Sequence, residues 1–163
     1  MEASDIQKAC RVGDLALLEA ALETDPAAVN STDKKLGWSP LYRAVICSNF
    51  AIAKVLLEKG ANPELRTKMG ETPLHQAADS GLKGFVQLLL ENKANPNAQQ
   101  NGRLQIDGDT PLHRAAAKGH VEVCEVLLEF KAQIDTQNHT VRTSVVGEDA
   151  FACSGGGRQG RSR

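Results

Sequence analysis

A tripeptide of Ser or Thr, then Pro, then Leu occurs three times in this chain of 163 residues, and its spacing constrains the fold more than any other feature. The copies occupy residues 39–41, 72–74 and 110–112, at intervals of 33 and 38 residues. After each copy come a polar ring side chain, small residues, a Gly or Ser, and an aliphatic cluster that ends in Leu-Leu. A period near 33 residues predicts stacked copies of one structural unit.

Each unit is predicted to begin with a helix at the proline. Proline has a fixed φ and no N–H, so it suits a first helical turn, and the preceding Ser39, Thr72 or Thr110 can cap that turn. The expected ends of these helices are Ser48, Gly81 and Gly119. Glycine adopts the left-handed conformation of a helix end at little cost, so serine is a mildly unfavourable choice at the first of these ends.

A second helix is predicted from an apolar face with i, i+3, i+4 spacing. Its members in the three units are Ile52, Val55 and Leu56; Phe85, Leu88 and Leu89; and Val123, Val126 and Leu127. The facing surface of the first helix is lined by small residues at 77–78 and 115–116, which allow two antiparallel helices to approach closely. After the second helix, Gly60 fits a left-handed end, whereas Lys93 and Lys131 in the matching places should each cost up to about 1 kcal/mol relative to glycine.

This pattern resembles the ankyrin repeat, because residues 72–77 and 110–115 both match its T-P-L-H-x-A signature. The resemblance covers about residues 4–137 and implies an all-α fold, an ankyrin-repeat α-solenoid of about four helix-turn-helix units with short β-hairpin fingers. The expected repeats are a degenerate first repeat at 4–32, then 33–66, 67–99 and 100–137, the last with an insertion in its finger.

The C-terminal segment, residues 138–163, loses the repeat and is rich in Gly, Ser and Arg, so we expect a disordered tail. A stack normally ends in a unit with a polar outer face, and no complete cap of this kind is visible. Two alternatives stay open: residues 140–146 fold back as a partial finger, or the outer face of the last repeat frays or meets a partner.

The histidines of the two signatures, His75 and His113, raise the question of catalysis. In ankyrin repeats this histidine hydrogen-bonds to the Thr of its own signature and ties the loops of neighbouring units together. Neither histidine has a nucleophile or an orienting acid at a recognisable spacing, and the pair formed by His113 and His120 is interrupted by Gly119. We therefore predict that the chain is not an enzyme and uses no cofactor and no metal.

Charge and cysteine usage favour a setting inside the cell. Nineteen basic and 20 acidic residues give a net charge of -1, so no overall field draws the chain to nucleic acid or to a membrane. The four cysteines, at 10, 47, 124 and 153, show no C-x-x-C spacing, and we expect reduced thiols. The N-terminal stretch lacks the pattern of a signal peptide and no apolar run reaches the length of a membrane span. The prediction is a monomer in the cytoplasm, the nucleus or both, without membrane contact.

The resemblance implies that partner proteins bind in a concave groove lined by fingertips and by the outward side of each first helix. The candidate binding residues are Trp38, Tyr42, Arg43, Ile46, Met69, Gln76, Asp79, Arg103, Arg114 and Lys118. The single Trp and the single Tyr lie beside Arg43, as in a binding hot spot. For Trp38 the alternative stays open that it only shields the neighbouring finger. For the insertion at 102–106 two alternatives stay open: it extends a contact surface with Arg103, or it is a neutral surface loop.

The functional prediction is a non-catalytic protein-binding module, acting as an adaptor, an inhibitor or a regulatory subunit, with no small-molecule substrate. A narrower alternative is an inhibitor of cyclin-dependent kinases, because the size resembles the small four-repeat inhibitors of that class. Their second repeat has a shortened first helix, whereas residues 39–47 here predict a full-length one. An alternative of another class, a nucleic-acid-associated regulator, requires a basic face. The resemblance also implies that an iron-dependent dioxygenase hydroxylates Asn97.

Overall fold

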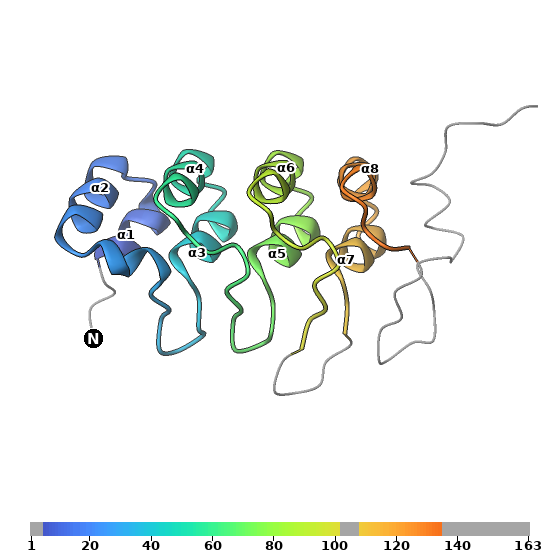
Figure 1. Cartoon of the computed structure of the whole chain (residues 1–163), viewed down its shortest axis with the longest axis horizontal. Helices are drawn as coiled ribbons and strands as arrows, with labels where there is room; N and C mark the ends of the chain where they lie inside the picture. The colour runs from blue at the N-terminus through green and yellow to red at the C-terminus, as the bar shows by residue number, and fades with distance from the viewer. Residues whose placement is uncertain (1–4, 102–107, 135–163) are drawn as a thin grey trace, which may run out of the picture.

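The computed structural model describes residues 5–101 and 108–134, and this part of the chain forms four pairs of helices in a row (Figure 1). The pairs are α1 (Asp5–Val12) with α2 (Leu15–Thr24), α3 (Pro40–Ile46) with α4 (Phe50–Glu58), α5 (Pro73–Asp79) with α6 (Lys83–Glu91), and α7 (Pro111–Ala117) with α8 (Val121–Glu129). A 3-10 helix, η1 (Pro26–Asn30), follows α2.

The first helices of the pairs form one layer and the second helices form the other (Figure 1). Along the first layer α1 contacts α3, α3 contacts α5, and α5 contacts α7. In the second layer α2 contacts α4, and α6 contacts α8. The predicted all-α solenoid of four helix-turn-helix units is confirmed. The helix α3 has the same length as α5 and α7, seven residues, as expected for a second repeat that is not shortened.

The predicted caps are present at the start of α3, α5 and α7. The Ser39 hydroxyl oxygen accepts a hydrogen bond from the Tyr42 N–H at 3.1 Å. At Thr72 the cap is reciprocal, because its N–H donates to Nδ1 of His75 at 3.2 Å and its hydroxyl oxygen accepts from the His75 N–H at 3.4 Å. Thr110 and His113 repeat this arrangement. The local sequence therefore specifies where each first helix begins.

The second ring nitrogen of His75 joins two units. With Nδ1 acting as an acceptor, the proton resides on Nε2, which donates to the Asp109 carbonyl oxygen at 3.0 Å. The side chain is completely buried. The structural role that the family resemblance implied for His75 is thus confirmed, since one imidazole satisfies its own helix cap and a loop of the next unit.

Left-handed backbone occurs where the helix ends were predicted. Ser48, Gly81 and Gly119 have φ values of 56°, 68° and 72°. After the second helices, Lys93 and Lys131 have φ values of 67° and 65°. These three non-glycine positions therefore retain the cost of placing a Cβ in this region of the backbone map.

We expect Lys93→Gly to raise the free energy of unfolding by up to about 1 kcal/mol, because it relieves the left-handed strain at the end of α6. Urea denaturation followed by circular dichroism measures the change. Lys54→Gly in the middle of α4 is the control and should lower stability by about 1 kcal/mol. A loss of stability in both variants would contradict the explanation from backbone strain.

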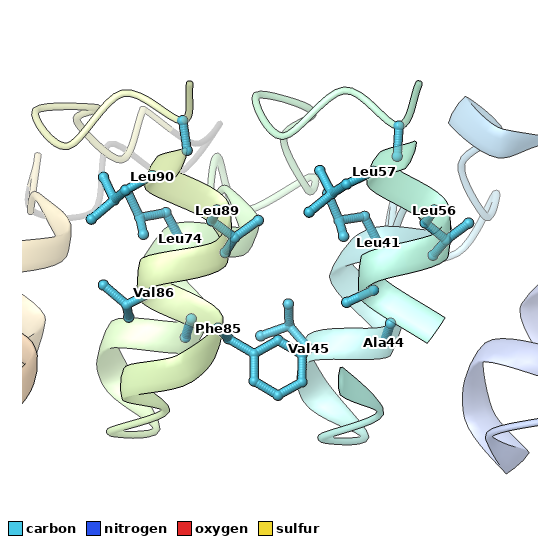
Figure 2. Packing of buried hydrophobic residues seen from close by; sticks show 14 of the residues in the cluster. Leu41, Ala44, Val45, Leu56, Leu57, Leu74, Phe85, Val86, Leu89 and Leu90 are labelled. Atoms are coloured by element: carbon cyan, nitrogen blue, oxygen red, sulfur yellow. The ribbon is translucent and has the colours of Figure 1, made fainter. Parts of the chain in front are cut away.

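The hydrophobic core runs through the whole stack. In Figure 2, Leu41 lies with Leu56 and Leu57 in one unit, and Leu74, Leu89 and Leu90 repeat this arrangement in the next. The Phe85 side chain projects toward the α3 residue Val45 of the preceding unit. The Phe85 ring also meets the edge of Phe50 with centroids 5.2 Å apart. Each unit thus buries apolar side chains of its neighbour. A single helix pair would leave those side chains exposed to water.

The fingers differ from the prediction of β-hairpins. They project from the layer of first helices, on the side away from the second helices (Figure 1), and no strand occurs within residues 5–101 and 108–134. A backbone N–H closes the base of each finger, from Asp33 to Trp38 O at 3.0 Å, from Thr67 to Glu71 O at 2.9 Å, and from Gln100 to Asp109 O at 2.8 Å. A strand requires a ladder of such bonds, whereas in the first two fingers the next bonds are those of turns, from the Gly37 N–H to Asp33 O at 3.0 Å and from the Gly70 N–H to Thr67 O at 2.9 Å.

Several expectations fall on residues outside the described part. These are the finger insertion at 102–106 with Arg103, the partial finger at 140–146, and the disordered tail at 138–163. Among the helices that are described, none has both the length and the apolar character that crossing a membrane requires.

Candidate functional site

The surface predicted to bind a partner is the side of the first-helix layer that adjoins the fingers, called here the inner face. Its polar side chains come from the first helices and from the bases of the fingers. The polar residues of the inner face that contact one another are Gln7, Asp33, Tyr42, Arg43, Glu71, Gln76, Asp79, Gln100 and Arg114. They form two clusters that together extend over all four units.

The first cluster surrounds Trp38, at the boundary of the first and second units. The Arg43 guanidinium lies over the Trp38 ring, 5.0 Å from its centroid, and pairs with Asp33 at 3.3 Å. Nε of Arg43 donates to the side chain of Gln7, and Nε2 of Gln7 donates to the Trp38 carbonyl oxygen at 3.1 Å. The cation–π contact fixes the position of the Trp38 indole, and the hydrogen bond from Gln7 fixes the Trp38 backbone.

The second cluster joins units two, three and four. The Tyr42 hydroxyl donates to Oε2 of Glu71 at 2.7 Å, and Oε1 of Glu71 pairs with Arg114 at 2.8 Å. Arg114 also lies 3.8 Å from Asp79 and donates to the side chain of Gln100. The side chains of Arg114 and Glu71 are each 18% exposed, so this ion pair is better shielded from water than an ordinary surface pair.

Burial alters the acid–base behaviour of several groups here. Burial, and then the hydrogen bond and charge of Glu71, raise the pKa of Tyr42, which keeps its hydroxyl a donor. Burial likewise raises the pKa of the Cys10 thiol to about 12. Partial burial opposes ionisation of Asp33, but N–H donors from Leu36 and Trp38 outweigh it and lower the pKa of that carboxyl. Cys10 is therefore a neutral thiol at pH 7, as expected for a structural cysteine.

Arg114→Gln should lower the free energy of unfolding by about 2 kcal/mol, because it leaves Glu71 and Asp79 without a cationic partner on a partly shielded surface. Lys83→Gln is the matched control. Its ion pair with Glu122 spans 3.8 Å and both side chains are at least half exposed, so the expected loss is below about 0.5 kcal/mol. Urea denaturation measures the loss of stability in both variants. Equal losses would mean that shielding from water adds nothing to the contribution of the Arg114 ion pairs to stability.

The structure places the candidate binding residues at different depths. Ile46 and Met69 are 36% and 44% exposed, and Lys118 is exposed as well. The partly buried candidates are Trp38, Arg43, Gln76, Asp79 and Arg114. Tyr42 is only 2% exposed, so the prediction that it is a surface aromatic is wrong. Its side chain is buried behind the surface of the inner face. Contact of these residues with a partner stays a prediction, and Arg103 lies outside the described residues.

Four members of the two clusters are not among the candidate binding residues: Gln7, Asp33, Glu71 and Gln100. The repeat period contains a signal for two of them, because Asp33, Thr67 and Gln100 follow one another at nearly equal intervals and each donates the N–H that closes a finger. Gln7 lies in the degenerate first repeat, where no signature identifies its counterpart.

Asn97, the predicted hydroxylation site, connects units three and four. Its Oδ1 accepts from the Gln133 N–H at 2.7 Å, and its Nδ2 donates to the Lys131 carbonyl oxygen at 3.4 Å. The equivalent Asn30 forms the same pair of bonds with Asn62 and Gly60. The amide therefore has a structural role, and hydroxylation stays a prediction.

No three His, Cys, Asp or Glu side chains group as a metal site would require within the part of the chain that the structure describes. Of the cysteines there, Cys10 and Cys124 are buried and Cys47 is partly buried.

Comparison with known proteins identifies the repeat. A family model described as ankyrin repeats in three copies matches residues 6–100, and one described as ankyrin repeats in many copies matches residues 80–128 and 112–145. A search of curated proteins finds no match. Ankyrin repeats are generally protein–protein interaction modules and are typically non-catalytic. Since the three-copy model alone covers more than half of the chain, and the stacked helix pairs agree with it, the chain belongs to the ankyrin repeat family.

Proposed function

We propose that this chain is a non-catalytic module that binds a protein partner through its inner face. The observation that carries the proposal is that exposed apolar side chains lie beside polar side chains that are held in place by hydrogen bonds and ion pairs. Tyr42, Glu71 and Arg114 are fixed by short contacts across three units, whereas Ile46 and Met69 remain available to solvent. Apolar residues on a pre-ordered base are a favourable starting point for association.

The energetic reason is the small entropy loss on docking. Side chains that are already held by hydrogen bonds and ion pairs lose little further freedom when a partner covers them. Burial of Ile46 and Met69, with the accessible part of Trp38, would then supply apolar contact area in the centre of the interface. The expected roles are adaptor, inhibitor or regulatory subunit. The four cysteines, which show no C-x-x-C spacing, support a reducing setting in the cytosol or the nucleus.

The test compares the full wild-type chain with two double variants. Ile46→Gln with Met69→Gln removes the exposed apolar residues of the inner face. Leu15→Gln with Val121→Gln is the matched control, because these residues are 39% and 38% exposed and begin α2 and α8. Circular dichroism and urea denaturation verify that all three proteins fold equally well.

Affinity purification with mass spectrometry identifies partners of the wild type, and calorimetry with the purified partner measures each affinity. The inner-face variant should bind at least about tenfold more weakly, and the control should bind within about twofold of wild type. A partner that binds all three proteins equally would exclude the inner face as its site.

A further inference from the structure

The charges of this nearly neutral chain separate in space. The fingers of units two and three present six exposed residues, five at the tips and Arg66 just before the base of the second finger, called here the fingertip platform: Lys34, Lys35, Leu36, Arg66, Lys68 and Met69. Four of the six are basic and the other two are apolar. Asp33 and Glu71, at the finger bases, face inward because they pair with Arg43 and Arg114. Glu64, near Arg66, is partly buried and accepts a hydrogen bond from the Asn95 N–H at 2.8 Å.

The layer of second helices carries more negative than positive charge. The exposed charged residues within α2, α4, α6 and α8 are Glu19, Glu23, Glu58, Glu91, Glu122, Glu125 and Glu129, against Lys54 and Lys83. The second helices lie on the side of the first layer that faces away from the fingers (Figure 1). The net charge of -1 therefore conceals an excess of positive charge at the fingertips and a negative excess along the second-helix layer, which the exposed Lys59, Lys93 and Lys131 after α4, α6 and α8 reduce.

The fingertip platform is held in one arrangement. The Lys68 N–H donates to the Leu36 carbonyl oxygen at 3.0 Å, and Nζ of Lys68 donates to the carbonyl oxygen of Lys34. Gly37, with φ of 73°, allows this approach, because a Cβ there would lie 3.1 Å from the Lys68 nitrogen. Leu36 and Met69 are thus presented on two tips whose backbones are bonded together.

The second tip is also fixed to the third finger. Nη1 of Arg66 donates to the carbonyl oxygens of Gly70 at 2.9 Å and Gln99 at 2.6 Å, and Nε2 of Gln100 donates to the Met69 carbonyl oxygen at 3.0 Å. No ion pair connects a basic residue of the fingertip platform to any acidic residue within 5–101 or 108–134. Within the described residues, no carboxylate therefore neutralises the charges of Lys34, Lys35 and Lys68.

We propose that the fingertip platform binds an acidic segment of a protein partner that carries at least one large apolar side chain. The inference rests on the proposed function and names the class of partner for it. Carboxylates of the segment pair with Lys34, Lys35 and Lys68, while its apolar side chain covers Leu36 and Met69. The mixed surface favours a peptide over a nucleic acid, because phosphate binding does not use two aliphatic side chains between the charges.

The experiment uses the full chain and a phage-displayed library of random dodecapeptides. Peptides selected on the wild type should be enriched in Asp and Glu together with a large apolar residue. A selected peptide, labelled with fluorescein, then reports affinity by anisotropy. Lys34→Glu with Lys35→Glu should weaken binding at least about tenfold, and added salt should weaken wild-type binding.

The matched control is Lys54→Glu with Lys83→Glu, which changes the net charge by the same amount on the second-helix layer. It should bind the selected peptide within about twofold of wild type, because local and not total charge determines the contact. Equal weakening in both variants would overturn the proposal. So would a selection that yields no peptides or peptides without acidic enrichment.

Two further outcomes separate this inference from its rivals. Weakening by Ile46→Gln without weakening by the fingertip variant overturns the inference while supporting binding through the inner face. Single-stranded DNA that binds as tightly as the peptide and displaces it would mean that the fingertip platform takes polyanions in general, which also overturns the proposal.

Discussion

Leu74→Ala should lower the free energy of unfolding by about 2–5 kcal/mol, the usual cost of truncating a fully buried leucine. Leu74 is completely buried in α5 and lies with Leu89 and Leu90 of α6 (Figure 2). Its unit is flanked by others on both sides, since α5 contacts both α3 and α7. A cavity here therefore weakens the stack in its middle, where both neighbouring units depend on the same helix pair.

Urea denaturation followed by circular dichroism checks this prediction, and Met69→Ala is the control. Met69 is an exposed side chain of similar size, so its truncation should change stability by no more than about 0.5 kcal/mol. A small loss at Leu74 would indicate that the unit collapses around the cavity. A loss at Met69 as large as at Leu74 would contradict the assigned core.

His75 should make stability depend on pH between about 6.5 and 4. Burial lowers the pKa of His75 from its usual 6.5 to about 4, although the hydrogen bond to Asp109 opposes this shift. Above pH 6.5 the imidazole is neutral in both the folded and the unfolded chain. As the pH falls toward 4, only the unfolded chain takes up the proton, so the folded state loses up to about 3 kcal/mol of stability across this window.

The check is the free energy of unfolding of wild type and His75→Gln at a series of pH values. Other titrating groups contribute to both proteins, so the difference between the two curves isolates His75. The difference should vary with pH between 6.5 and 4 and be constant above that range. Parallel curves throughout would show that His75 is not held neutral by burial.

The local features of the fold were predictable because local rules determine them. The residues before Pro40, Pro73 and Pro111 cap their helices as predicted, since a hydroxyl at that position needs only the next turn as a partner. The left-handed ends at Ser48 and Lys93 were likewise identified from their places in the repeat. The 3.6-residue period predicted the apolar faces of the second helices, and their members are buried except Val55 and Leu88, which are partly buried.

The features that were not predictable depend on contacts between units. Strands in the fingers would need extended pairing within each hairpin, but the first two tips bond to each other, from Lys68 to Leu36. The depth of Tyr42 depends on Glu71, 29 residues away, and on Arg114 in the following unit. No spacing rule within one repeat encodes how far the next repeat covers a side chain.

The sequence by itself determined the repeat, the number of units, the starts of the first helices and the family, because each of these depends on patterns a few residues long that recur along the chain. Only the tertiary structure decided which charges neutralise one another and which remain at the surface. Stacking brings Glu71 to Arg114 of the next unit, and the folding of one finger onto α3 brings Asp33 to Arg43, so both carboxylates turn inward to arginines while Lys34, Lys35 and Lys68 stay on the fingertips. Composition records only the sum of these charges, whereas a partner responds to where they lie.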